Sequence, residues 1–385
     1  MKPLTIKRVQ IYAFGDESLD RPVWRKDMDN VYTTNIVCRI TTEEGLEGIG
    51  GTIDYVEDRF NDIILQSASL YANGLIGRSA LDRGEIYNWM SRRPSWLPLP
   101  TMSMIDIALW DLMGKYANLP IYQMAGAHRD KILAYATSPT FKDHQGYFDY
   151  IEKAMAAGFK SIKIHPFTFF DLDYPLVKEI SERYGDKMLF TLDPDSGYTR
   201  KEALKMCKLM EQYDCWEWFE SPLPDRDLEG YKYLHEHTHI NISDGGNCKL
   251  TLMDINNYCK ENAYTDLRID VTNCGGFTPM LKIMALSQAY NMQCEIQSWG
   301  NIITKAAAVH MMCACTNCTY FEMNYPYEDF EVAAKNLIRI DEEGYVHVPQ
   351  GPGLGIELDW DEVERLSVST YDTAAEQPYV NKMTR

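Results

Sequence analysis

The chain has 385 residues, and its 38 Lys and Arg against 56 Asp and Glu give a formal net charge of −18. This length predicts about two domains with a large core, and 45% hydrophobic with 24% charged residues is ordinary for a globular protein. The acidic balance argues against a nucleic-acid binder and against docking on anionic membrane surfaces, because both need clustered Lys and Arg. No apolar run reaches the ~18 residues of a membrane span. The start lacks the apolar stretch of a signal peptide, so a cytoplasmic location is expected, with the ten cysteines as thiols.

The first third of the chain predicts a mixed α+β unit. Residues 6–14 and 33–42 are rich in β-branched side chains and are predicted as strands. A glycine-punctuated turn is expected at 44–48. Helices are predicted over 58–72 and 103–117, the second with apolar residues at helical spacing.

From about residue 130, short apolar runs alternate with amphipathic helices. The runs cover residues 132–137, 161–164, 188–192, 216–219, 240–243, 267–269 and 293–296, and a last run ends at 322. The helices cover residues 147–157, 173–184, 201–213, 227–235, 252–262, 279–290 and 303–313. Strand, helix, strand at this spacing indicates parallel βαβ units, and eight of them predict a (β/α)8 barrel within an α/β fold.

Polar residues recur at the ends of these predicted strands. They are Lys163, His165, Asp193, Glu220, Asp244 or Asn247, Asp270, Gln297 and Glu322. In barrels of this type the strand ends of the C-terminal face carry the chemistry. One such residue per βα unit would be an unlikely pattern for scattered surface loops, so we interpret the set as a candidate active site.

The residue types in this set indicate proton abstraction beside a bound metal. Asp193 and Glu220 end adjacent strands, so both carboxylates can reach one cation, and oxygen ligands suit Mg²⁺. Lys163 and His165 lie two residues apart and face the same side of their strand. A metal that holds a carboxylate next to such a base suits removal of an α-proton.

Several motifs resemble the enolase superfamily, in particular its mandelate racemase type. They lie at residues 45–50, 105–115 with Leu119-Pro120, 270–278 and 349–355. The resemblance implies three segments. These are an α+β capping domain over residues 1–128, a catalytic (β/α)8 barrel over 129–335, and a C-terminal segment over 336–385 that returns to the cap. It also implies a homo-oligomer.

The resemblance further implies roles for individual residues. Asp193 and Glu220 match the first two Mg²⁺ ligands of the family. Lys163-Ile164-His165 matches the family's Lys-x-Lys, with His165 at the position of the base. Glu322 matches a carboxylate that contacts the substrate or the enediolate.

Two positions depart from the family pattern. Gly246 stands where the third metal ligand, a Glu, is usual, and either Asp244 or Asn247 could replace it. Gln297 stands where the family has a second base, a His paired with the Asp at position 270. An amide cannot act as a general base at neutral pH. The opposite face of the barrel mouth therefore has no evident proton relay.

Specificity is expected in the capping loops near residues 16–26 and 50–55. Trp24 and Arg25 could reach a substrate from the first loop, although an ordinary solvated loop fits the sequence equally well. Tyr55 and Asp195 are the other candidate substrate contacts.

The sequence thus predicts a Mg²⁺-dependent lyase of the acid-sugar dehydratase kind. It would remove the α-proton of a small hydroxy carboxylate and expel the β-hydroxyl to give a 2-keto acid. Racemisation or epimerisation of an α-carbon acid is the alternative reaction. A non-catalytic barrel that binds a small acid is the alternative class, and Gly246 and Gln297 are the residues that keep it open. A dipeptide epimerase is less expected. The resemblance implies that members of that subgroup carry a Lys on the sixth barrel strand, at the position where this chain has Asp270.

Overall fold

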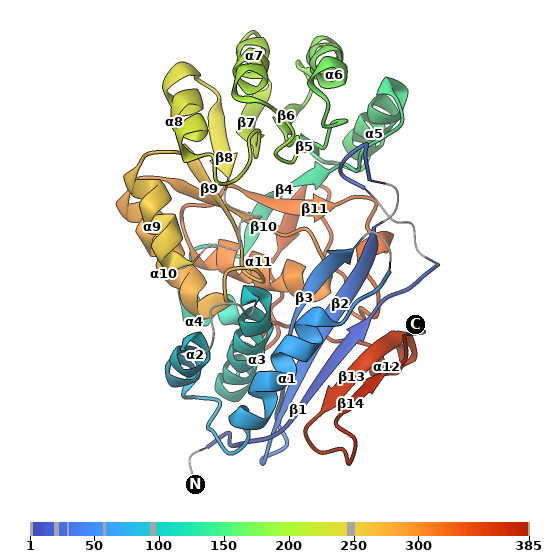
Figure 1. Cartoon of the computed structure of the whole chain (residues 1–385), viewed down its shortest axis with the longest axis vertical. Coiled ribbons are helices and arrows are strands. Elements are labelled where there is room, and N and C mark those ends of the chain that lie inside the picture. The colour runs from blue at the N-terminus through green and yellow to red at the C-terminus, as the bar shows by residue number, and fades with distance from the viewer. Residues whose placement is uncertain are drawn as a thin grey trace.

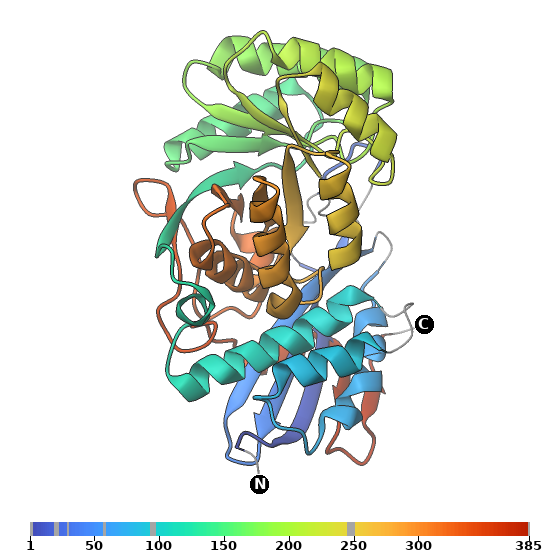
Figure 2. The same ribbon diagram turned by 90° about the vertical axis from the view of Figure 1, so that its left-hand side faces the viewer.

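The computed structural model describes residues 3–18, 23–28, 31–56, 59–92, 98–244 and 251–383. In these ranges the chain forms a parallel barrel sheet surrounded by helices and a separate antiparallel sheet beside it (Figures 1 and 2). None of the helices in the described ranges is long and apolar enough to cross a membrane.

The barrel sheet has the hydrogen-bonded order β10-β9-β8-β7-β6-β5-β4-β11, so the first and last barrel strands, β4 and β11, are neighbours. All of these pairs are parallel. The strands are β4 (Lys131–Thr137), β5 (Ser161–Ile164), β6 (Leu189–Leu192), β7 (Trp216–Glu220), β8 (Asn241–Asp244), β9 (Asp266–Asp270), β10 (Gln293–Gln297) and β11 (Tyr320–Asn324). The connecting helices are α5 (His144–Ala156), α6 (Phe170–Tyr184), α7 (Arg200–Met210), α8 (Leu228–His237), α9 (Leu252–Lys260), α10 (Phe277–Ala289) and α11 (Ile302–Ala314). The predicted (β/α)8 barrel is confirmed, and it is nearly closed.

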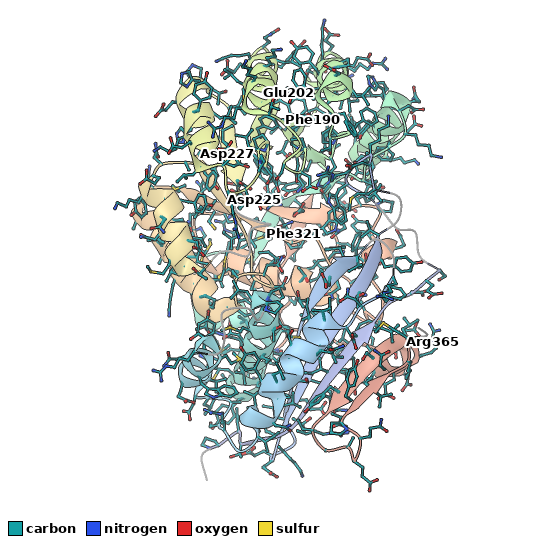
Figure 3. The ribbon with its side chains drawn as sticks, in the orientation of Figure 1. Phe190, Glu202, Asp225, Asp227, Phe321 and Arg365 are labelled. Atoms are coloured by element: carbon teal, nitrogen blue, oxygen red, sulfur yellow. The ribbon has the colours of Figure 1, made fainter. Side chains whose placement is uncertain are left out.

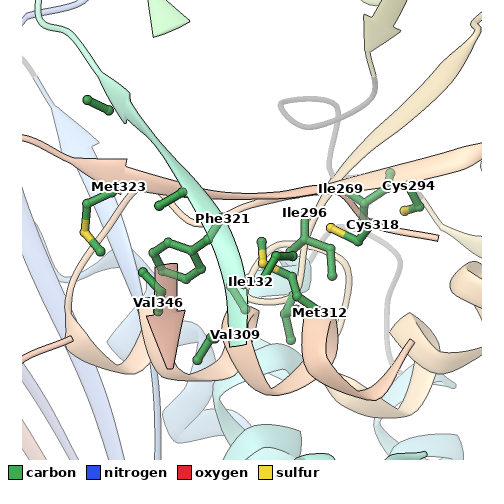
Figure 4. Packing of buried hydrophobic residues seen from close by; sticks show 14 of the residues in the cluster. Ile132, Ile269, Cys294, Ile296, Val309, Met312, Cys318, Phe321, Met323 and Val346 are labelled. Carbon is green, nitrogen blue, oxygen red and sulfur yellow. The ribbon is translucent and has the colours of Figure 1, made fainter. Parts of the chain in front are cut away.

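Alternation along the strands separates the core from the site. Phe321 packs outward with Ile296 and Met312 into the layer between the barrel and α11 (Figure 4). Because neighbouring strand residues point to opposite faces, Glu322 faces the barrel interior. Charged side chains such as Glu202 lie on the outer helices (Figure 3). The apolar side chains of the strands thus pack against the surrounding helices, while polar strand-end residues such as Glu322 face the barrel interior.

The capping sheet combines both ends of the chain in the order β14-β13-β1-β2-β3. Its strands are β1 (Ile6–Phe14), β2 (Tyr32–Thr42), β3 (Glu47–Val56), β13 (Ser367–Asp372) and β14 (Tyr379–Asn381). Strands β13 and β1 pair antiparallel, so the C-terminal segment returns to the N-terminal unit as the resemblance implied. The remaining elements are α1 (Ile63–Leu75), α2 (Arg83–Ser91), α3 (Leu99–Ala117), α4 (Ile121–Ala125), the 3₁₀ turn Glu328–Phe330, β12 (Tyr345–His347) and α12 (Trp360–Leu366).

Helix α3 connects the cap to the barrel through two buried aspartates. Asp106 accepts hydrogen bonds from the Thr278 backbone N at 2.9 Å and from its hydroxyl at 2.6 Å, at the start of α10. Asp111 accepts from the backbone N of Ile49 in β3 and of Leu354 in the C-terminal segment, both at 2.8 Å. The motif at residues 105–115 therefore joins the three parts of the chain.

Several predicted boundaries are wrong, and β3 is the clearest case. A turn was predicted over 44–48, because glycine disfavours strands, yet β3 begins at Glu47 and includes Gly48, Gly50 and Gly51. A Cβ on Gly50 would lie 2.0 Å from the Met104 backbone oxygen, so glycine is required for α3 to approach the strand. The predicted helix at 58–72 is α1, and α2 had not been predicted at all.

Replacing Gly50 with alanine is expected to destabilise the protein by at least about 1–3 kcal/mol, because the added methyl overpacks the contact between β3 and α3. Gly84 near the start of α2 has no atom within 4 Å of its would-be Cβ, so Gly84→Ala should be neutral or slightly stabilising. Chemical denaturation of the two variants checks this. Equal stability of both would show that α3 does not rest on β3 as described.

Candidate active site

A cavity of about 530 Å³ lies at the C-terminal ends of the barrel strands, beneath the capping sheet. Its lining comes from both units: Trp24, Arg25, Asp27, Met28, Tyr55, Lys163, His165, Asp193, Asp195, Gln297, Trp299 and Glu322. The predicted strand-end residues Lys163, His165, Asp193, Gln297 and Glu322 therefore share one space. The four predicted substrate contacts Trp24, Arg25, Tyr55 and Asp195 line it as well.

Lys163 brings three carboxylates together at the bottom of this cavity. Its Nζ lies 3.1 Å from Asp193 Oδ2, 3.1 Å from Glu220 Oε1 and 2.8 Å from Glu322 Oε1. Burial disfavours the ammonium, but the carboxylates outweigh this effect and raise the pKa of Lys163. Lys163 therefore stays protonated at neutral pH. As an ammonium it can orient an anion.

The acidic partners respond in the opposite direction. Burial alone would raise the pKa of Asp193, but the Lys163 charge and the His165 contact hold it well below its usual range. Burial likewise opposes ionisation of Glu322, yet Lys163 and Arg268 lower its pKa to about 2. Both side chains are therefore carboxylates at neutral pH and weak bases.

The donor set fits a hard divalent cation. Oxygens of Asp193 and Glu220 already converge on one positive group, 3.1 Å from each, and carboxylate oxygen is the ligand type that Mg²⁺ prefers. Asp244 is fully buried at the end of β8 and accepts from Ser221 Oγ at 2.8 Å. Asn247 and Gly246 lie outside the described residues. Within the described part of the chain, no three His, Cys, Asp or Glu side chains are grouped to hold a metal, so a third ligand is not assigned.

His165 is oriented through its Nδ1 atom. Nδ1 lies 2.6 Å from the backbone oxygen of Ser138, and because a carbonyl only accepts, Nδ1 carries the hydrogen. The neutral ring is therefore the tautomer with an unprotonated Nε2. That atom lies 3.2 Å from Asp193 Oδ2 on the cavity side. Nε2 is thus the atom at which His165 can take or release a proton.

Arg268 was not predicted, although it organises the same carboxylates from below. It is 1% exposed on β9 and donates from Nε to Glu220 Oε1 at 2.9 Å and from Nη2 to Glu322 Oε2 at 2.6 Å. Nη2 also donates to the Tyr135 hydroxyl at 2.7 Å, above an aromatic layer of Tyr135, Trp218 and Tyr320. The one available signal was its position two residues before Asp270, on the same strand face.

Replacing Arg268 with methionine is expected to lower the free energy of unfolding by about 3–5 kcal/mol, because Glu220 and Glu322 would stay buried with only Lys163 to compensate them. Arg226 is exposed, and its replacement by methionine should change stability by less than about 0.5 kcal/mol. Denaturant unfolding of the two variants measures both. A stable Arg268→Met protein would contradict the charge arrangement described here.

Asp270 and Gln297 occupy the opposite side of the barrel mouth, on paired strands. Asp270 accepts from the Thr272 backbone N at 2.6 Å and its hydroxyl at 2.8 Å, and from Asn273 Nδ2 at 3.1 Å. Burial raises the pKa of Asp270 to about 6, against these hydrogen bonds. Asp270 does not line the cavity, whereas Gln297 does, with a buried Oε1 that has no hydrogen-bond partner among the described residues. This side offers an amide rather than an imidazole.

Comparison with known proteins places this site in a family. The family described as "Enolase C-terminal domain-like" matches residues 147–363, and the mandelate racemase/muconate lactonizing enzyme N-terminal domain matches residues 21–126. One similar solved structure is that of a mandelate racemase/muconate lactonizing enzyme family protein from Pseudovibrio sp. Its sequence is 40% identical to this chain, and the two structures superpose with a TM-score of 0.94. It covers 96% of this chain and 99% of that chain.

Relatives of named function carry out different reactions. An arabinonate dehydratase from Saccharolobus solfataricus is 30% identical over 66% of this chain and 68% of its own length. A hydrophobic dipeptide epimerase from Enterococcus faecalis is 26% identical over 83% of this chain and 90% of its own. Solved structures of the same fold, 23–24% identical, contain magnesium. Their likeness to this chain shows the fold.

Proposed function

Because the chain belongs to the mandelate racemase/muconate lactonizing enzyme branch of the enolase superfamily, we propose that it is a Mg²⁺-dependent lyase. It removes the α-proton of a small hydroxy carboxylate, a sugar acid, and eliminates the β-hydroxyl to give a 2-keto acid. The observation that carries this proposal is the single-sided arrangement of proton-transfer groups. Among the described residues that line the cavity, His165 presents a ring nitrogen, Nε2, that carries no hydrogen when the ring is neutral, whereas Gln297 on the other side of the mouth offers an amide.

The residues have distinct roles in this proposal. Asp193 and Glu220, with Asp244 or Asn247, hold Mg²⁺, which when bound polarises the substrate carboxylate and stabilises the charge that develops on it. The Lys163 ammonium orients the same carboxylate. His165 Nε2 takes the α-proton and returns it to the oxygen that leaves the β-carbon, so one imidazole serves both steps if hydrogen and oxygen leave from the same face. The departing hydroxide becomes water, and the enol tautomerises to the 2-keto acid.

Epimerisation is the second candidate, and the dipeptide epimerase relative favours it. Exchange of configuration generally needs a proton acceptor on one face and a donor on the other. On the face across from His165 stand Gln297, which is an amide, and Asp270, which is bonded to its own turn. Elimination needs no group there, and this supports the lyase proposal.

A screen of acid sugars with Mg²⁺, scored for 2-keto acid formation, tests the proposal. At least one acid should give product at a rate that disappears with chelator and returns with Mg²⁺. Turnover that is unaffected by chelation would refute the metal-dependent mechanism.

A further inference from the structure

A second cavity, of about 510 Å³, lies beside α5 and shares no described lining residue with the candidate active site. Its walls come from α5, from the residues that follow β4 and β11, and from Arg339 in the C-terminal segment. Its volume falls in the range of about 300–1,000 Å³ that is typical of small-molecule sites. It is therefore large enough for a ligand of its own.

Aromatic rings form the floor of the second cavity. The Tyr150 ring centroid lies 5.6 Å from that of Phe141 and 6.0 Å from that of Tyr325. Phe141, Tyr325 and Tyr327 are only half-buried, so they leave apolar surface open. Tyr150 is 5% exposed, and its buried hydroxyl has no hydrogen-bond partner among the described residues. Burial raises the pKa of Tyr150 well above its usual value, so this hydroxyl remains a donor that a ligand can satisfy.

The rim of the second cavity carries both signs of charge. Lys153 on α5 and Glu328 after β11 are exposed, and neither forms an ion pair with the side chains that the structure describes. Asp149 and Arg339, the other charged lining residues, already have hydrogen-bond partners. A free cation and a free anion beside an aromatic floor complement a zwitterion, whereas a lone anion or a lone cation would leave one of the two unpaired.

A short segment after β4 separates the second cavity from the proposed base. Pro139 and Phe141 line the cavity, while Ser138 and Thr140 contact His165. The His165 backbone N donates to Ser138 Oγ at 3.1 Å, and Nδ1 lies 2.6 Å from the Ser138 backbone oxygen. Thr140 Oγ1 donates to the His165 backbone oxygen at 3.3 Å. A ligand that packs on this segment from outside therefore acts on the groups that orient the imidazole.

We propose that the second cavity is a regulatory site for a zwitterionic α-amino acid with an aromatic side chain, and that its occupancy is transmitted to His165. The ligand's ring lies on the aromatic floor, its ammonium faces Glu328, and its carboxylate faces Lys153. By packing on the segment after β4, the ligand favours some positions of the Ser138 carbonyl over others. The site goes beyond the function proposed above, and only an effect on turnover rests on that function.

Calorimetry with four compounds tests the site in the full chain without Mg²⁺, so that no metal holds their carboxylates in the active-site cavity. L-Phenylalanine carries the ring and both charges, 3-phenylpropanoate lacks the ammonium, 2-phenylethylamine lacks the carboxylate, and L-alanine lacks the ring. Phenylalanine should bind at one site. Removal of either charge should weaken binding at least about threefold, and removal of the ring at least about tenfold.

Charge reversal at the rim locates the binding. Lys153→Glu should weaken phenylalanine binding at least about fivefold, because the carboxylate then meets a like charge, and Glu328→Lys should do the same through the ammonium. Both side chains are exposed, so neither change disturbs the core. Lys201→Glu is the control, since Lys201 is exposed on α7 and does not line the cavity, and it should bind as the unmodified protein does.

Nitrogen-15 NMR of the histidine rings tests the connection to the proposed base without any substrate. The His165→Asn protein identifies the His165 signals. Saturating phenylalanine should shift the Nδ1 signal of His165 and leave the signals of the exposed His239 in place, and it should cause no such shift in Lys153→Glu. On any acid that is turned over, phenylalanine should change kcat in the unmodified protein but not in Lys153→Glu.

Absence of binding, equal binding of all four compounds, or binding that persists unchanged in both rim variants would overturn the inference. An unshifted His165 signal in the saturated protein would overturn the regulatory connection. The binding and NMR measurements need no turnover, so the inference stands or falls separately from the proposed function.

Discussion

The His165→Asn protein is expected to lose at least about 10²-fold in kcat on its true substrate, the low end of what a positioned base contributes. The asparagine amide can still donate to the Ser138 carbonyl as Nδ1 does, so the local fold is kept while the proton acceptor at Nε2 is lost. His165→Ala should lose at least as much. Steady-state kinetics with Mg²⁺ at saturating substrate measure this loss.

His239→Asn is the matched control, because His239 is exposed two residues after α8 and does not line the cavity. Its kcat should equal that of the unmodified protein. If His165→Asn retained activity within a few-fold, proton abstraction would have to be assigned to another residue, and Lys163 would need to lose its proton despite three carboxylates around it.

Glu220→Gln is expected to weaken Mg²⁺ binding by at least about tenfold and to lower kcat by at least about 10²-fold. The amide keeps the size of the side chain but removes the charge that Lys163 and Arg268 both contact. Asp193→Asn should behave alike. Calorimetry with Mg²⁺ alone measures the affinity without depending on knowledge of the substrate.

Glu217→Gln provides the control on the same strand. Glu217 accepts from the Tyr320 hydroxyl at 2.7 Å and from Ser161 Oγ at 3.0 Å, among residues near the starts of β5, β7 and β11. Its replacement should leave the affinity for Mg²⁺ unchanged. Unaltered Mg²⁺ affinity in both Glu220→Gln and Asp193→Asn would place the cation elsewhere. The unchanged affinity of Glu217→Gln would then no longer distinguish the two ends of the strand.

The barrel and most of its polar strand ends could be predicted because their signals are local. Short apolar runs and amphipathic helices alternate from about residue 130, and Lys163, Asp193, Glu220 and Glu322 each lie within or at the end of such a run. In parallel barrels, chain order alone places such ends on one face. The cavity lining contains Lys163, Asp193 and Glu322, while Glu220 contacts the same Lys163 from just beneath.

What the sequence did not reveal depends on contacts between distant segments. Arg268 reads as one polar residue in a short strand, and only barrel closure brings it to Glu220, Glu322 and Tyr135. Trp299 joins Trp24 through packing between the barrel and the cap, 275 positions apart along the chain. Strand β3 carries glycines that local propensity assigns to turns, although α3 requires them.

Proton NMR of the reaction in D₂O tests the lyase assignment most directly. With the cognate acid and Mg²⁺, a 2-keto acid should accumulate, while unreacted substrate keeps its configuration at the α-carbon. The reason is that His165 is the proton-transfer group on one face and Gln297 stands on the other. Interconversion of both stereoisomers with deuterium at the α-carbon, and without any 2-keto acid, would rule out the lyase reaction and establish epimerisation instead.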